Sequence, residues 1–157
     1  MRNRMLLLAV CFFISTTMLF ACQGKSNEPQ PPEIVYGQDV CELCGMIISE
    51  GRFAAAILLT DGRSLIFDEI GDMLVYQMDH PEAQVKAWFV HDYPSEAWIR
   101  GETAYFVKSA SLKTPMAGGI AAFEKMDAAE AFATEWDGIV FSLDELRAQV
   151  HIDVHGN

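Results

Sequence analysis

The sequence is poor in basic residues, in cysteine and in histidine. It holds 11 Lys and Arg against 22 Asp and Glu, which gives a formal net charge of −11 at pH 7. So acidic a chain lacks the basic surface that binds nucleic-acid phosphates. It also lacks a Gly-rich phosphate loop, an H-E-x-x-H motif and a Ser/His/Asp nucleophile set. The composition therefore favours binding of a cation or of a basic partner.

Long apolar runs are also scarce, and the one that stands out lies at the start of the chain. Residues 6–20 are largely apolar, follow Arg2 and Arg4, and end just before Cys22. The run is shorter than the roughly 20 residues that a spanning helix needs. We expect a secretory signal peptide over residues 1–21. The cysteine after it resembles a bacterial lipobox, so we expect a fatty acyl anchor (palmitate) on Cys22, with an uncleaved anchor or a secreted form as alternatives.

The next segment has the composition of a flexible tether. Residues 23–33 (QGKSNEPQPPE) are polar and proline-rich, without apolar periodicity. We expect a lipidated tether over residues 22–35, one folded domain over 36–152 and a tail over 153–157. Loss of residues 1–21 removes two basic residues and no acidic one, which leaves nine against 22 and a net charge of −13. A chain anchored this way faces the extracytoplasmic side, in a periplasm or on the outer face of the cell membrane.

Residues 36–152 are long enough for one hydrophobic core, and their first half predicts the order β-β-α-β. Two apolar runs of strand length flank Asp61 and Gly62, a strong hairpin signal. Asp68 is placed to cap the helix that follows, in which apolar residues recur at helical spacing until His80. The pair Asp68 and Glu69 at this helix start is explained better by capping than by acid–base chemistry. The strands of this half are expected at residues 53–60, 64–67 and 86–92.

The second half predicts a similar order. Asp127 is expected to cap a second helix, which Gly138 ends, and Ser142-x-x-Glu145 is a capping box for a final short helix. The fold class is therefore α+β: two β-β-α-β halves, with antiparallel sheet and helices packed on one side. The strands of this half are expected at residues 103–108, 120–124 and 139–141.

Three features stand apart from the packing pattern. Cys41, Cys44 and Met46 form a Cys-x-x-Cys-x-Met run beside a glycine, Met116 lies in a turn rich in proline and glycine, and His91 ends a strand. Thiolate and thioether are soft ligands, and together they suit Cu(I). A strand-end histidine is a weaker candidate for the same ion. These five residues are the candidate metal ligands.

Other readings of the Cys-x-x-Cys pair stay open. A zinc site would need four N or S ligands, and no histidines are spaced to complete one. A thioredoxin-type site places the pair at a helix N-terminus, whereas the residues after Cys44 are typical of loop and strand. A disulfide would close a tiny loop and gain little chain entropy. The alternatives to a Cu(I) site are thus a zinc site, the cysteine pair of a thiol–disulfide oxidoreductase or thiol-dependent lyase, and a small structural disulfide in an adaptor lipoprotein.

Several motifs together resemble the NosL family. They are the lipobox Cys22, the Cys-x-x-Cys-Gly-Met run, the Asp-Gly turn and the segments FDEIGDML, VHDY, TPMAGGIAAFE and SLDEL, over nearly all of residues 22–147. The resemblance implies a two-halved β-β-α-β fold and a lipoprotein that is not an enzyme. It implies that such a protein binds one Cu(I) and delivers copper for assembly of the copper–sulfide centre of nitrous oxide reductase in denitrification.

The resemblance also assigns ligands and partners. By motif, Cys44, Met46 and Met116 match the family's Cu(I) ligands, and the chain departs from the family in also carrying Cys41. That residue is expected to be a second thiolate, a resolving thiol or a reversible disulfide partner. The implied partners are nitrous oxide reductase, its assembly machinery in the membrane, and the membrane itself through the lipid anchor, but no nucleic acid. Another copper or thiol client is the alternative.

Overall fold

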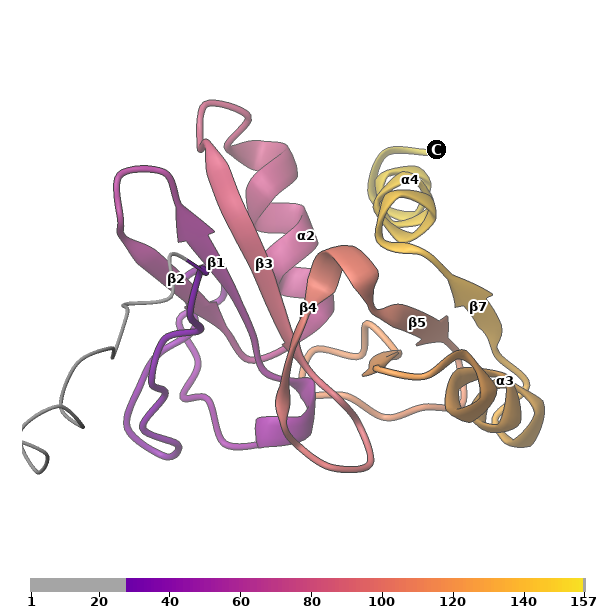
Figure 1. Ribbon diagram of the computed structural model, residues 1–157. Coiled ribbons are helices and arrows are strands. Elements are labelled where there is room, and N and C mark those ends of the chain that lie inside the picture. Colours follow the sequence, from indigo (N-terminus) through magenta and orange to yellow (C-terminus); the bar gives the residue numbers. More distant parts are fainter. Residues whose placement is uncertain (1–27, 157) are drawn as a thin grey trace, which may run out of the picture.

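A four-stranded antiparallel sheet forms the first half of the fold, in the order β2-β1-β3-β4 (Figure 1). The structure is a computed structural model and describes residues 28–156, so the expected signal peptide, Cys22 and the start of the tether lie outside the described residues. Gly62 makes the β1–β2 turn with a φ of 90°, which favours glycine. The strands are β1 (Ala55–Leu59), β2 (Ser64–Phe67), β3 (Val85–His91) and β4 (Trp98–Arg100), and the short 3₁₀ turn η1 (Gly51–Phe53) precedes β1.

Helix α2 (Ile70–Asp79) covers one face of this sheet. Its buried residues include Ile70, Met73 and Leu74, which recur at three- and four-residue spacing and pack against the same face of β1 as Ile57. The opposite face carries a smaller buried cluster around Phe89. The helix N-terminus therefore lies directly after β2, at the end of the sheet where the candidate site is built.

A three-stranded antiparallel sheet, in the order β6-β5-β7, forms the second half. Its two faces are covered by different helices, which lie above and below it in Figure 1. Phe106 on β5 points into the core shared with α4 and the first half, whereas the next residue, Val107, packs with α3. The elements are β5 (Tyr105–Lys108), β6 (Ile120–Phe123), α3 (Met126–Glu135), β7 (Ile139–Phe141) and α4 (Leu143–His155).

Two buried contacts fix how the halves meet. Asp92, which follows β3, forms a parallel bridge with Ala122 of β6, and its carboxylate accepts hydrogen bonds from the Glu124 amide (2.9 Å) and from Ser95. The fully buried Phe106 belongs to the same core cluster as the residues that α2 covers. Asp92 is thus a structural residue that ties the end of β3 to the second half.

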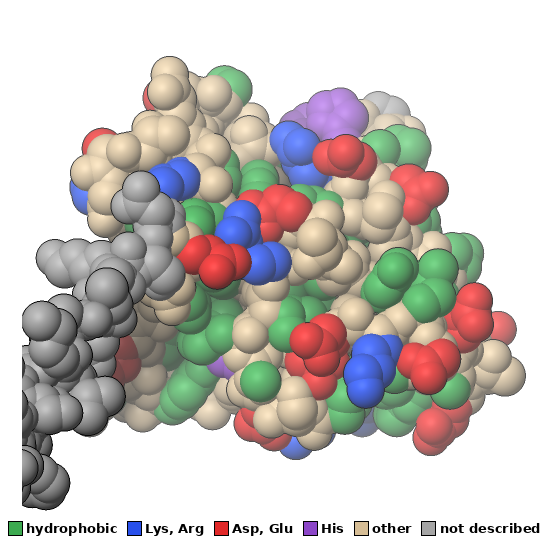
Figure 2. Space-filling model, viewed as in Figure 1, with side chains coloured by type: hydrophobic (Ala, Val, Ile, Leu, Met, Phe, Trp, Pro, Cys, Tyr) green, Lys and Arg blue, Asp and Glu red, His purple; other side chains and the backbone are tan. Residues whose placement is uncertain are grey.

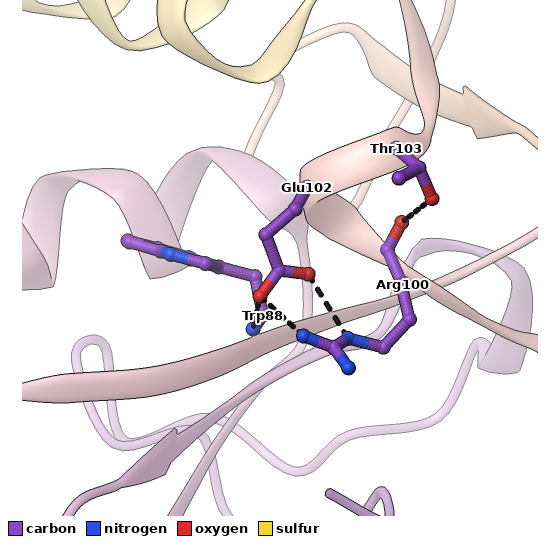
Figure 3. Close-up of polar contacts among 4 residues, drawn as sticks. All are labelled: Trp88, Arg100, Glu102 and Thr103. Carbon is purple, nitrogen blue, oxygen red and sulfur yellow. Dashed lines mark hydrogen bonds and ion pairs between the residues drawn. The ribbon is translucent and has the colours of Figure 1, made fainter. Parts of the chain in front are cut away.

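Glu102 lies in the 3₁₀ turn η2 (Gly101–Thr103), which connects β4 of the first half to β5 of the second, and it fixes the position of this connection. Its carboxylate accepts from the Trp88 amide at 3.2 Å and from the Arg100 guanidinium at 2.7 and 3.0 Å (Figure 3). Burial raises the pKa of Glu102, but the hydrogen bonds from Arg100 and from backbone amides, together with the positive charge of Arg100, outweigh burial and lower the pKa below its usual value. The carboxylate thus stays ionised where the chain leaves the first sheet.

The α+β class and the antiparallel sheets are confirmed, and three details differ from expectation. Strand β4 was not expected, and it is paired only with β3. Helix α4 spans 13 residues and continues through His155, across most of the expected tail. Ile34, in the expected tether, is buried in the main core. Within residues 28–156, no helix has the length and apolar character needed to cross a membrane.

The expected helix caps are right at one helix and wrong at two. Ser142 caps α4 through a complete capping box, as expected. Glu69 rather than Asp68 is the N-cap residue of α2, and no side chain caps that end. Asp127 lies inside α3, whose N-cap residue is Lys125. At α2, the two acidic side chains are free for other contacts, and these contacts build the candidate site.

Candidate metal centre

The cysteines lie on a tight turn that is docked on the end of β2. The Cys41 amide donates to the Met46 carbonyl at 2.8 Å, and the Gly45 amide donates back to the Cys41 carbonyl at 3.0 Å. Gly45 has a φ of 73°, which allows the chain to close this turn. The Glu42 amide donates to the Ile66 carbonyl at 2.9 Å. The turn is thereby held against the strand that leads into α2.

Two thiols and two carboxylates meet at this place. One ligand atom from each of Cys41, Cys44, Asp68 and Asp72 lies within 4.8 Å of each of the others. The Cys41 thiol donates to the Asp72 carboxylate at 3.4 Å, and the Cys44 thiol donates to that of Asp68 at 3.6 Å. Cys41 is buried and Cys44 is partly exposed. The four residues form a group of two sulfur and two oxygen donors that could hold a metal ion.

The electrostatics of this group favour the protonated thiols. Burial raises the pKa of Cys41 far above its usual value. Burial also raises the pKa of Cys44, and the negative charge of Asp68 adds to the effect. Burial raises the pKa of Asp72 as well, although its thiol partners oppose the shift. A bound cation would reverse this balance, because its positive charge stabilises the thiolates and the carboxylates together.

The turn that carries Met116 is attached to the same end of α2. The Met116 amide donates to Glu69 Oε2 at 3.0 Å, and the Gly118 amide donates to Glu69 Oε1 at 3.2 Å. Glu69 directly follows Asp68, which accepts from the Cys44 thiol. Both sulfur-bearing turns are therefore held by consecutive residues. Met116 and Met46 are 42% and 51% exposed, so both methionines lie at the surface.

His91 lies elsewhere, and this placement argues against the expected ligand role. Its Nδ1 is 2.9 Å from the Ala54 carbonyl, and its Nε2 is 3.2 Å from the Tyr36 hydroxyl. The ring is buried and packs on Trp98, and it does not belong to the thiol–carboxylate group. Burial lowers the pKa of His91. Both nitrogens are engaged by the fold, so the residue acts as a neutral core histidine.

Comparison with known proteins places this geometry in a family. The family model for NosL matches residues 32–151. The chain belongs to the NosL family. Its fold is similar to that in the crystal structure of the copper chaperone NosL from Shewanella denitrificans, with a TM-score of 0.67 and 26% identity, over 75% of this chain and 96% of the other. No curated protein matches the chain. The family predicted from the motifs is thereby confirmed.

Sequence reasoning missed three acidic residues of this NosL site. Asp68 and Glu69 were explained as helix-capping residues, and Asp72 was not singled out. The available signal was the density of acid in the segment FDEIGD, where three carboxylates fall within five residues at a helix start. Only the tertiary docking of the cysteine turn on this helix end makes Asp68 and Asp72 neighbours of the thiols.

The arrangement suits exchange of a proton for a metal ion. Each thiol already donates its hydrogen to a carboxylate, so a base stands next to each sulfur when a cation displaces the proton. Metal binding by thiols requires deprotonation and releases protons. This chain therefore holds Cys41 and Cys44 in a neutral, hydrogen-bonded form that a soft cation can convert to thiolate.

Proposed function

We propose that this NosL protein is a copper chaperone that binds one Cu(I) ion through Cys44, Met46 and Met116, with Cys41 as a second thiolate. The observation that carries the proposal is the meeting of both cysteine thiols with two carboxylates within 4.8 Å, beside a helix end that also holds the Met116 turn. Thiolate and thioether donors favour Cu(I) over harder ions. The match to a copper chaperone structure supports the same assignment.

The proposed mechanism is ligand exchange between soft donors. Loading replaces the thiol proton of Cys44 with Cu(I), and Asp68 is the nearest base for that proton. The exposed thioethers of Met46 and Met116 complete the site from the solvent side. A thiol or thioether of the receiving protein can approach from that side and replace them in turn. The buried Cys41 stays behind the ion, where it holds copper until the exchange is complete.

The geometry favours a binding protein over an enzyme. Catalytic cysteines have lowered pKa values, because the thiolate is the attacking species. Here burial raises the pKa of both cysteines, and the pair lies in a turn rather than at a helix N-terminus. A thiol–disulfide exchange role would need the opposite shift. We therefore propose a role in copper handling without catalysis.

We further propose the place and the client that the family resemblance implies. The protein would be anchored by lipid on Cys22 and would face the extracytoplasmic side, in a periplasm or on the outer face of the cell membrane. Its copper would go to nitrous oxide reductase, for the copper–sulfide centre, with the membrane-bound assembly machinery as partner. The acidic composition does not favour nucleic acid, and several basic side chains in Figure 2 lie beside acidic ones with which they form ion pairs.

A competition titration with a Cu(I) chelator tests the site under reducing conditions. We expect one Cu(I) per chain, and Cys44→Ala should weaken binding by more than about a hundredfold, because losing a ligand costs more than losing a supporting partner. Met116→Ala should cost less, since a neutral thioether binds more weakly. Met126→Ala is the matched control, because this methionine is 45% exposed but lies on α3. Unchanged affinity in Cys44→Ala, or tighter binding of Zn²⁺ than of Cu(I), would refute the proposal.

A further inference from the structure

Glu69 is a buried acidic side chain that lies next to the proposed copper site but outside its group of donor atoms. It is only 3% exposed, and burial raises its pKa. Both carboxylate oxygens are engaged by backbone amides of the other half of the fold, Oε2 by Met116 and Oε1 by Gly118. A buried carboxylate that uses both oxygens in this way is a connector rather than a free ligand.

The Glu69 carboxylate fills the space next to two glycines, Gly71 and Gly118, and leaves no room for a side chain at either position. A Cβ atom at Gly71 would lie 2.8 Å from Oε1 of Glu69, and one at Gly118 would lie closer still to the same atom. Neither glycine is needed for a left-handed backbone, since neither has a positive φ. Their small size leaves room for Glu69 to pass between α2 and the turn. Either glycine can therefore be used to displace the carboxylate without altering Glu69 itself.

The turn that Glu69 holds is otherwise anchored at its far end, where the Lys108 ammonium donates to the Gly118 carbonyl at 3.1 Å and the Ser109 amide donates to the Gly119 carbonyl at 2.9 Å. Residues 114–119 contain one proline and two glycines, and Ala117 adopts a φ of 62°, which is rare for a residue with a side chain. The Gly119 amide donates to Thr114 Oγ1 at 3.0 Å, which closes the turn on itself. A ligand on a loose turn loses conformational freedom on binding, and this loss weakens affinity.

We propose that Glu69 is a positioning residue, which pre-orders the Met116 turn so that the thioether is in place before copper arrives. The proposal rests on the proposed role of Met116 as a copper ligand. Glu69 is not part of the thiol–carboxylate group; it acts through the backbone amide of the proposed ligand residue itself. Because the turn is already ordered in the folded protein, metal binding loses less conformational entropy. Supporting contacts of this kind therefore tighten a metal site.

A double-mutant cycle with Cu(I) affinity as the readout tests this role. Glu69→Gln keeps the shape, but an amide has one acceptor oxygen and turns a donor toward the second backbone N–H. We expect Glu69→Gln to weaken Cu(I) binding about tenfold in the native background and to have no effect in a Met116→Ala background. Gly118→Ala should reproduce the loss with Glu69 intact, because its Cβ displaces the carboxylate.

Asp92→Asn is the matched control, since Asp92 is a second buried carboxylate that accepts an amide of the other half. It should lower the unfolding free energy without changing Cu(I) affinity. X-ray absorption on the copper-loaded Glu69→Gln protein should show one sulfur fewer around copper. An equal loss of affinity with and without Met116, or none at all, would overturn the positioning role. If Met116→Ala alone leaves affinity unchanged, the ligand assignment fails first, and the positioning role fails with it.

Discussion

The slope of Cu(I) affinity against pH gives the number of thiols that lose a proton when copper binds to the proposed site. Burial raises the pKa of both Cys41 and Cys44, so both thiols are protonated in the apo protein between pH 6 and 8. Each thiol that becomes a ligand must release one proton, so each contributes about a tenfold rise in the binding constant per pH unit. With both sulfurs on copper we expect a rise of about a hundredfold per pH unit. Acid therefore weakens binding, and the slope is steeper than a single thiolate allows.

The assay is chelator competition at pH 6, 7 and 8, corrected for the protonation of the chelator. Cys41→Ser should halve the logarithmic slope to about one, because only Cys44 then loses a proton to copper. Its sulfur lies in the same group as that of Cys44, but the two cysteines donate to different carboxylates, so the remaining pair stays intact. A binding constant independent of pH would refute the thiolate site. An unchanged slope in Cys41→Ser would show that this cysteine is not a ligand.

Three further predictions concern the scaffold. Phe106→Ala should lower the unfolding free energy by about 4 kcal/mol in urea denaturation, because a fully buried aromatic ring is removed from the core shared by both halves; a loss below about 1 kcal/mol would contradict that packing. Burial lowers the pKa of His91, so the unfolded chain binds its proton first. Stability should fall as pH drops below about 6.5, by up to about 1.4 kcal/mol per pH unit, and His91→Gln should remove this component. Ser142→Ala should cost about 1 kcal/mol and loosen the start of α4, which amide hydrogen exchange can detect; unchanged protection there would argue against the capping box.

The sequence predicted the elements wherever a local rule decides them. The hairpin at Asp61 and Gly62, the helix that ends before His80 and the capping box at Ser142 all depend on residues within one turn of each other. Strand β4 and the length of α4 were not predicted, because their stability comes from β3 and from the shared core. Local chemistry alone cannot show which segment gains such a partner.

The residues of the candidate site also divide into those that local sequence indicates and those that only tertiary contacts reveal. The thiols and Met116 were predicted because soft donors in loops have few structural uses. Asp68 and Glu69 were given to helix capping, since an acid before a helix has a ready local explanation. In the structure no side chain caps α2, and both carboxylates instead reach segments 24 and 47 residues away along the chain. A local explanation of these two residues therefore concealed contacts that are distant in sequence.

Neither of the two sulfur-bearing turns is woven into a sheet. The cysteine turn is hydrogen-bonded to the end of β2, and the Met116 turn is hydrogen-bonded to the Glu69 carboxylate and, through the Gly118 carbonyl, to Lys108. If the protein transfers copper as proposed, the transfer needs movement of only these two turns, and the strand ladders of the two sheets stay paired. Copper release and global unfolding would then involve different parts of the molecule. The same molecule could bind and release copper repeatedly without exposing its buried strands to proteases or to aggregation.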